Sequence, residues 1–507
     1  MKKLLALLLV LVMLFSMFAC TNTDDQKESG NESDSGSESQ SDSASDSASE
    51  SDSASESEDN MTDLGIPKAD FNGQKFRLNS SNANIGVPVV FADEYDGTTL
   101  TAALADRVYE LESTFNVDIT YTQLEAWGND TKAIQTMVSS GLDEVDLVNL
   151  SAFNDQACMG LWYDVNKFEA FNNFQDPWWS KYIMDTCTFN GTTFGLSGAL
   201  SYHKWWDVAH ISFNKTALDE KGVAYPYQAV YDGKWTYDML VSLSTGMYQD
   251  IDDVAGKSNG DFYGFVNTEG YNSGFPAMFG IDSMGKDASG KLALMIDEAH
   301  WSEAIDKMVA LCSGEVGASL PKHQLFAAFK DNRVMFTNVP LNRTHTEWGT
   351  AGTKFGVLPM PKYDESQADY KCGLLPSFFA MPKTIKASNT DFASFMVNAY
   401  AAAGQKYLVP AYFEYGLKSK YSDDLNNDAK MFDIIDATIY FEQGPFWYSK
   451  TGLIVGNINP GDNANKEFAS YVAQWKDLDQ KYIDGINAAY AGNPNDSVWG
   501  AAYSGKW

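Results

Sequence analysis

The strongest constraint on the fold is an alternation of strand and helix patterns early in the body of the chain. Lys75–Leu78, Val117–Tyr121 and Val145–Leu150 are short runs of β-branched, aromatic or aliphatic residues, which is typical of strands. Between them, apolar residues recur at steps of three or four over 100–115 and again over 130–140, which predicts amphipathic helices. This order predicts an α/β fold, with a parallel sheet flanked by helices.

The ends of these strands are the first place to look for a binding site. In open sheets of this kind, ligands bind beyond the carboxyl ends of the strands. Trp127 lies just past the second predicted strand in a polar loop, and Phe153 follows the third. We therefore expect both side chains to contact a bound substrate, with packing inside the same lobe as the alternative.

The length of the chain indicates more than one domain. Its 507 residues exceed what a single ordinary core covers. A second region begins near Gly195. Its expected elements are helices over 236–246 and 297–312, strands over 332–337 and 355–358, and mainly helical structure after Pro382.

The first 20 residues predict a secretory signal. Lys2 and Lys3 precede an apolar run that is too short for a bilayer-spanning helix, and a polar stretch begins directly after Cys20. Met17–Cys20 resembles the lipobox of bacterial lipoproteins, which implies lipidation of Cys20. A plain secretory signal with an incidental cysteine is the alternative.

Residues 21–60 are expected to form a disordered tether. Serine alternates there with Asp, Glu or Ala, so the segment has almost no apolar surface with which to offset its ordering entropy. Its like charges favour an extended chain. We expect it to hold the folded body away from a membrane surface.

Charge and cysteine usage exclude several classes of function. The chain has 36 basic against 68 acidic residues and a net charge of −32, which argues against nucleic acid as a partner and against electrostatic docking on an anionic bilayer. Besides Cys20, the cysteines are scattered and form no C-x-x-C pair, so we expect no metal site and no cofactor. Their pairing stays open, because four cysteines (Cys158, Cys187, Cys312, Cys372) allow three disulfide patterns and buried free thiols are as probable.

Several ordered segments together resemble one family, the extracellular solute-binding proteins of bacterial ABC importers, in the sugar-binding group that includes maltose-binding protein. Phe355–Lys362 resembles the group's G-V-x-P-x-P-K strand and turn, and Asp232–Thr236 resembles its D-G-x-W-T turn. Ala327–Phe336 and Ser212–Lys215 resemble further elements, although Asn332 stands where glycine is usual. The resemblance spans most of residues 70–490.

The resemblance implies a two-lobed periplasmic-binding-protein-like fold, in which each lobe is a mainly parallel sheet flanked by helices. Hinge crossings join the lobes, near Gly195–Tyr202, near Arg333–Asn338 and after 391–402. The expected division gives residues 61–197 and 334–398 to the N-terminal lobe, and residues 198–333 and 399–507 to the C-terminal lobe.

The cluster Tyr202–Asp207 fits solute recognition best, because it combines large aromatics with a carboxylate beside a proposed crossing. We expect Trp205 or Trp206 to contact the solute and Asp207 to accept hydrogen bonds from its hydroxyls. Packing within the hinge is the alternative. Three further candidates follow from position and from the resemblance: Asn338, Trp348 and Trp447.

Together these features predict a lipid-anchored, monomeric binding protein on the outer face of the cell membrane. It would capture a small-molecule solute, most plausibly an oligosaccharide, and deliver it to the permease subunits of an ABC importer without catalysis. The alternatives are a binding protein for a peptide or another polar solute, a surface glycoside hydrolase, and an adhesin with the same fold. A hydrolase would need two carboxylates about 5–10 Å apart across a sugar.

Overall fold

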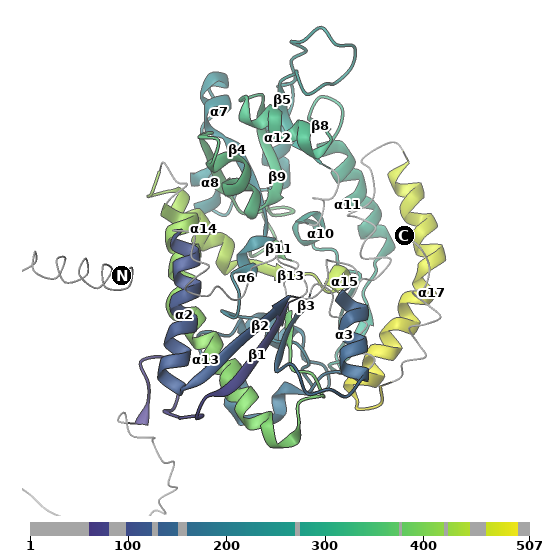
Figure 1. The fold of residues 1–507 in the computed structure, drawn as a ribbon. Helices are drawn as coiled ribbons and strands as arrows, with labels where there is room; N and C mark the ends of the chain where they lie inside the picture. The colour runs from purple at the N-terminus through teal and green to yellow at the C-terminus, as the bar shows by residue number, and fades with distance from the viewer. Residues whose placement is uncertain are drawn as a thin grey trace, which may run out of the picture. The chain divides into compact units, whose positions relative to one another are not determined.

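The computed structural model describes residues 60–80, 98–123, 130–150, 160–268, 274–374, 378–419, 424–446 and 463–494. Within these ranges the structure contains two larger sheets with helices around them (Figure 1). No helix in the described ranges combines the length and the apolar character needed to cross a membrane.

The N-terminal lobe is built on a four-stranded sheet with the order β12-β3-β1-β2. Its strands are β1 (Gln74–Ser80), β2 (Val117–Gln123), β3 (Leu147–Leu150) and β12 (Phe378–Ala380). Strand β1 pairs in parallel with both β2 and β3, while β12 runs antiparallel to β3. The predicted parallel sheet is therefore confirmed, with one antiparallel strand added at its edge from a distant part of the chain.

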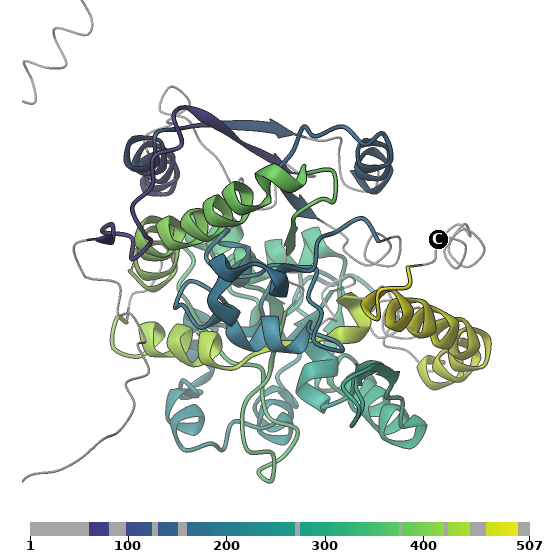
Figure 2. The same ribbon diagram turned by 90° about the horizontal axis from the view of Figure 1, so that it is seen from below.

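Three helices accompany this sheet, namely α2 (Thr99–Phe115), α3 (Asp130–Ser139) and α13 (Thr390–Val409). Helix α2 begins where the Thr98 side chain accepts a hydrogen bond from the Thr101 backbone N–H, and it ends at Asn116 in the left-handed conformation. Helices α2 and α13 pack against each other, as the view from below shows (Figure 2). Residues about 290 positions apart thus share one core.

The C-terminal lobe is built on a five-stranded sheet with the order β10-β4-β9-β5-β8. Its strands are β4 (Ala209–Asn214), β5 (Tyr263–Asn267), β8 (Gly317–Ser319), β9 (Val334–Pro340) and β10 (Phe355–Leu358). Strand β5 is parallel to β8 and β9, whereas β4 is antiparallel to β9 and β10. This sheet is mixed because β4 alone runs antiparallel to the other four strands, which all point in one direction.

The remaining helices are mostly short, and two begin as the sequence predicts. Thr236 caps α9 by accepting from the Met239 N–H, and Asp297 caps α11 by accepting from Ala299 and His300. The helices outside the N-terminal sheet are α5 (Lys181–Thr186), α6 (His203–Trp206), α7 (Lys215–Lys221), α8 (Tyr227–Tyr231), α9 (Tyr237–Ser244), α10 (Gly274–Phe279), α11 (Glu298–Leu311), α12 (Lys322–Lys330), α14 (Asp428–Ala437), α15 (Gln443–Phe446) and α17 (Ala464–Tyr490). The structure also has 3₁₀ segments over 165–167, 169–174 and 387–389, and π-helical segments η5 (Thr344–Gly349) and η7 (Pro410–Ser419).

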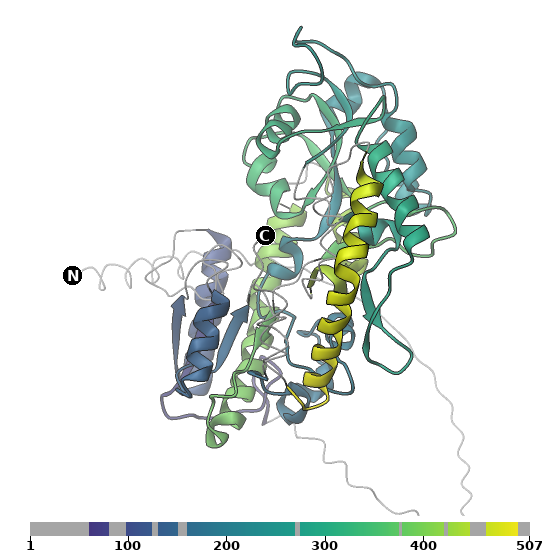
Figure 3. The same cartoon turned by 90° about the vertical axis from the view of Figure 1, so that its right-hand side faces the viewer.

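The long helix α17 contacts both lobes (Figure 3). Near its start, Phe468 stacks on Trp301 of α11 with ring centroids 5.4 Å apart. At its end, Tyr490 lies 5.3 Å from Phe189 and 4.6 Å from Phe194, which precede the first crossing. The helix therefore connects the C-terminal sheet region to the N-terminal lobe.

The chain passes between the two sheets at three places in the described residues. The first crossing, 198–208, leads into β4, and Val208 forms a bridge with Leu374 in β11 (Cys372–Leu374). The second lies between β10 and β12, later than the position expected near Arg333–Asn338, because β9 and β10 both pair with β4. The third joins α13, which packs on α2, to α14, which packs on β10. It continues into β13 (Ile439–Phe441), which pairs in parallel with β11.

Candidate functional site

The predicted aromatic cluster lies on the first crossing, around the short helix α6. Trp205 is 3% exposed, and its ring stacks on Phe413 of η7 with centroids 5.0 Å apart. Its Nε1 donates to Oδ1 of Asp436 at 2.7 Å, across 231 residues of sequence. Trp205 therefore shows the alternative expectation, packing within the hinge. Its ring packs inside the crossing, and its indole N–H joins the crossing to α14.

Trp206 is placed differently from its neighbour, because it is only partly buried. Its ring lies 5.6 Å from Tyr202, which in turn stacks on Tyr412 at 4.7 Å. The three rings form one aromatic surface on the first and third crossings. Of the two tryptophans, Trp206 is the one whose ring retains exposed area for a ligand.

Asp207 is held in a small polar network next to Trp206. Its Oδ1 accepts from Nδ2 of Asn342 at 3.0 Å, and its Oδ2 lies 3.3 Å from Nε2 of the buried His203. The Asp207 side chain is 37% exposed. A carboxylate oriented by two partners and still partly open to solvent is well suited to accept hydrogen bonds from hydroxyl groups.

The other C-terminal-lobe candidates are more deeply placed. Asn338 lies inside β9, paired with Ile211, and is 1% exposed. Trp348 is 0% exposed and stacks on Phe329 at 4.0 Å within the core of the C-terminal lobe. The Trp348 ring is enclosed by protein, so in this conformation no part of it faces a solute.

The carboxyl ends of β1 and β3 bring polar side chains together, as parallel pairing requires. Ser80 and Asn149 lie opposite each other, and Ser80 Oγ donates to Asn149 Oδ1 at 3.4 Å. Asn149 Nδ2 also donates to the carbonyl of Phe378 at 3.3 Å. Trp127, which follows β2 in the sequence, and Phe153, which follows β3, lie outside the described residues, as do Trp447 and Cys20.

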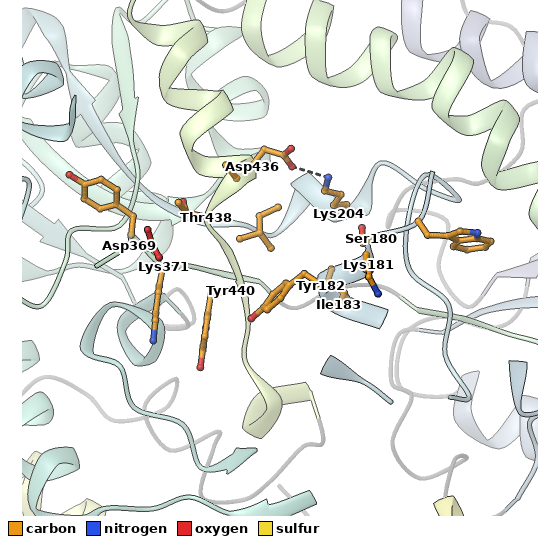
Figure 4. A pocket seen from close by; sticks show the side chains of 14 residues that line it. Ser180, Lys181, Tyr182, Ile183, Lys204, Asp369, Lys371, Asp436, Thr438 and Tyr440 are labelled. Carbon is orange, nitrogen blue, oxygen red and sulfur yellow. Dashed lines mark ion pairs between the residues drawn. The ribbon is translucent and has the colours of Figure 1, made fainter. Parts of the chain in front are cut away.

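A cavity of about 810 Å³ opens beside α6, lined by residues of three crossing segments and of α5 (Figure 4). We call it the crossing pocket. At one wall Lys204 Nζ pairs with Asp436 Oδ1 at 2.9 Å, the same oxygen that receives the Trp205 indole. Tyr182, Lys371 and Tyr440 line it as well. No sequence pattern singled these residues out, because each lies in an ordinary helix, turn or strand.

Two carboxyl groups lie next to this pocket, the half-buried Asp282 and the buried Glu442. Burial raises the pKa of Asp282 to about 6, against the hydrogen bond from Tyr440 and the charge of Lys371. Burial and the nearby charge of Asp282 raise the pKa of Glu442 well above its usual range, and Glu442 Oε1 accepts from the Ala277 N–H at 3.0 Å. A proton on Asp282 at mildly acidic pH removes a negative charge beside β13.

Among the described residues, one acidic group has a geometry that a cation could use. Single oxygens of Asp250, Asp252 and Asp261 lie within 4.8 Å of one another. Burial would raise the pKa of Asp261, but hydrogen bonds from Ser258, Ile251 and two tyrosines hold it below its usual value. These hydrogen bonds show that the Asp261 carboxylate holds the backbone of its own loop in place.

The cysteines in the described residues are free thiols. Cys187, Cys312 and Cys372 are buried and unpaired with one another, and burial raises the pKa of Cys372 to about 11. Cys158 lies outside the described residues. Protonated thiols in apolar surroundings are unreactive, so these three serve as small core residues.

Comparison with solved structures finds several binding proteins with the same fold. An ABC substrate-binding protein from Listeria monocytogenes in complex with cycloalternan is 12% identical, with a TM-score of 0.51 over 83% of this chain and 99% of that chain. The galacto-N-biose-/lacto-N-biose I-binding protein of Bifidobacterium longum is 14% identical, with a TM-score of 0.54 over 82% and 98%. A cyclo/maltodextrin-binding protein complexed with maltotetraose is 14% identical, with a TM-score of 0.51 over 83% and 97%.

These matches show that the chain has the two-lobed fold of periplasmic binding proteins, as the ordered sequence segments indicate. No protein-family model matches the sequence, and no curated protein matches it. At 12–14% identity the shared feature is the backbone arrangement. The ligand therefore has to be argued from this chain's own side chains.

Proposed function

We propose that this protein is the solute-binding component of an ABC importer and that its solute is a carbohydrate, most plausibly an oligosaccharide. The observation that carries the proposal is the fold: 82–83% of this chain aligns with nearly the full length of proteins described as bound to cycloalternan, lacto-N-biose or maltotetraose. Such a fold captures solute by closing two lobes around it.

The aromatic and polar groups on the first crossing support a carbohydrate. The exposed part of the Trp206 ring offers an apolar face for the C–H side of a sugar ring, and Asp207 offers an oriented acceptor for its hydroxyls. We propose that the site also includes the polar ends of β1 and β3, together with Trp127, Phe153, Asn338 and Trp447. Trp205 would support Trp206 from within the crossing.

We propose that the protein is carried outside the cytoplasm and anchored to the membrane through lipid on Cys20. The serine-rich segment 21–60 would then be the tether that gives the folded body reach to capture solute and to meet the permease. In this proposal the protein acts as a monomer and catalyses no reaction on the solute.

The first experiment measures ligand binding to the purified full chain. A thermal-shift screen with maltose, maltotetraose, lacto-N-biose and a set of short peptides should show stabilisation by at least one saccharide, because a ligand bound only to the native state stabilises by mass action. Stabilisation by peptides and by no saccharide would contradict the carbohydrate proposal. Release of a smaller sugar from a bound glycan would contradict the proposal that the protein is not an enzyme.

The second experiment asks whether the first crossing carries the site. Trp206→Ala should weaken saccharide binding at least tenfold, and Asp207→Asn should weaken it less, since the amide oxygen can still accept a hydrogen bond. Tyr109→Ala is the matched control, because this aromatic residue on α2 is 74% exposed and has no place in the site. Equal affinity in the Trp206 variant and the control would remove this residue from the proposed site.

A further inference from the structure

We propose that the crossing pocket is a second binding site, for a neutral polyhydroxylated solute such as a small saccharide or polyol. It is distinct from the solute site proposed above, which comprises Trp206 and Asp207 on the first crossing together with the strand ends. The proposal does not rest on transport, because it follows from the cavity, its aromatic side chains and its balance of charge.

The first argument is the size and construction of the cavity. A volume of about 810 Å³ lies within the range of small-molecule sites in proteins, about 300–1,000 Å³. Its walls come from α5 of the N-terminal lobe, from Lys204 on the first crossing, from 369–371 on the second and from 436–440 on the third. Among the described residues, none of those lining the pocket belongs to β1, β2 or β3, and neither Trp206 nor Asp207 is among them.

The second argument is the aromatic surface of the pocket. Tyr182 on α5 lines the pocket and is 47% exposed, so part of its ring is open to a ligand. Its hydroxyl accepts from the Phe441 N–H at 3.3 Å, which fixes the ring against β13. Tyr440 lines the pocket with Lys371 Nζ 4.6 Å from its ring centroid. Figure 4 shows the Tyr182 and Tyr440 side chains side by side at the pocket wall.

The third argument is the balance of charge. Lys204 is paired with Asp436 at 2.9 Å, and Lys181 is paired with Asp185 at 3.0 Å. Lys371 and Asp369 are of opposite sign and both line the pocket. Because no single sign dominates, the pocket does not favour a strongly charged ligand, whereas hydroxyl groups can donate to the carboxylates and accept from the ammonium groups.

The fourth argument is that the pocket continues. A neighbouring cavity of about 430 Å³ shares Tyr182 and Tyr440 and extends along α5 toward β6 (Met284–Lys286). The two tyrosines therefore border both cavities. This arrangement accommodates a ligand longer than one sugar ring, with a ring contact at its centre.

The position of the pocket means that a bound ligand would affect the arrangement of the two lobes. A ligand there would touch α5 of the N-terminal lobe and the second and third crossings at once, and it would rest on the Lys204–Asp436 pair that holds α6 to α14. Occupancy would therefore favour the lobe arrangement in which these segments keep this spacing. The affinity of the transport site for its solute would then change by the coupling free energy between the two sites.

The test observes the pocket directly through Ile439, which lines it and is half-buried. The full chain carrying ¹³C-methyl isoleucine is titrated with glucose, maltose, lacto-N-biose and glycerol, and the Ile439 resonance is assigned with Ile439→Val. We expect a saturable shift of this methyl signal with at least one of these compounds. Tyr182→Ala should weaken the titration at least tenfold, and Tyr182→Phe, which keeps the ring, should weaken it much less.

Two comparisons separate this site from the transport site. Trp206→Ala should leave the Ile439 titration unchanged, even where it abolishes stabilisation by saccharides in the thermal-shift screen. The proposal is overturned if none of the four compounds moves the Ile439 signal. It is also overturned if the shift survives Tyr182→Ala and disappears in Trp206→Ala, because the shift would then report binding at the transport site. Methyl spectra of the variants that otherwise match the parent show that each variant is folded.

Discussion

The strand ends and the crossing pocket are built in opposite ways. At the strand ends, Ser80 and Asn149 meet because they are opposite each other in the parallel strands β1 and β3. In the crossing pocket, the residues come from four separate stretches of chain, and the pair Lys204–Asp436 joins positions more than 200 residues apart. The first region is thus determined by the pairing of neighbouring strands in one sheet. The second is determined by how the crossings pack against each other.

The difference separates two roles for neighbouring aromatic residues. Trp205 is buried and bonded to Asp436, so it belongs to the packing of the crossings, while Trp206 keeps an exposed part. If the comparison is right, damage to the crossings should act mainly on stability, and damage at the exposed groups should act mainly on binding.

The largest expected effect is at the contact between α13 and the first crossing. A Cβ on Gly404 would lie 1.8 Å from the carbonyl oxygen of Ala199, which is backbone and cannot move aside alone. Gly404→Ala should lower the free energy of unfolding by about 4 kcal/mol or more, measured by urea denaturation. The control is Gly416→Ala, whose Cβ would lie 3.3 Å from its nearest neighbour and should change stability by less than about 1 kcal/mol. Equal effects would mean that the first crossing is not tightly packed.

The next effect distinguishes the two tryptophans. Trp205→Ala removes a buried ring and its hydrogen bond to Asp436, and it should lower the free energy of unfolding by about 3 to 4 kcal/mol. Trp206→Ala should lower it by about 1 kcal/mol, because the ring is only partly buried. Denaturation and ligand titration of both variants should give opposite rankings for stability and for affinity. The same ranking in both measurements would break the comparison.

A smaller effect concerns pH at the crossing. The pKa of Asp282 is about 6 in the folded protein against 3.8 for an exposed aspartate, so the folded state binds the proton more tightly than the unfolded state. The ionised Asp282 carboxylate therefore lowers the free energy of unfolding by its full amount well above pH 6, and this loss of stability disappears as the pH falls toward 4. Relative to Asp282→Asn, the parent protein should gain about 2 kcal/mol of stability between pH 7 and pH 4. A difference that is independent of pH would show that Asp282 is not buried as described.

The smallest effect on stability is expected for the exposed ring of the crossing pocket. Tyr182→Ala should change the free energy of unfolding by less than about 1 kcal/mol, because the side chain is 47% exposed and contributes one hydrogen bond. Thermal denaturation without ligand measures this. A loss of several kcal/mol would indicate that Tyr182 supports the crossing and is not available to a ligand.

Much of the fold could be predicted because it depends on local patterns. The helix predicted over 100–115 is α2, and the helices predicted over 236–246 and 297–312 are α9 and α11. The place where the chain leaves the C-terminal sheet was predicted too early, near 333–338. That position depends on which strands pair with β4, and strand pairing between distant segments leaves no periodic signal along the chain.

The sequence by itself determined the order of strands and helices, the parallel core of the N-terminal sheet and the aromatic cluster beside the first crossing. These depend on periodicity, composition and neighbours in sequence. Only the tertiary structure decided which tryptophan of the cluster is buried, where the lobes are joined, and that Tyr182, Asp436 and Tyr440 share a cavity. The physical reason is that burial and cavities depend on contacts between residues hundreds of positions apart, and such contacts are set by how whole elements pack.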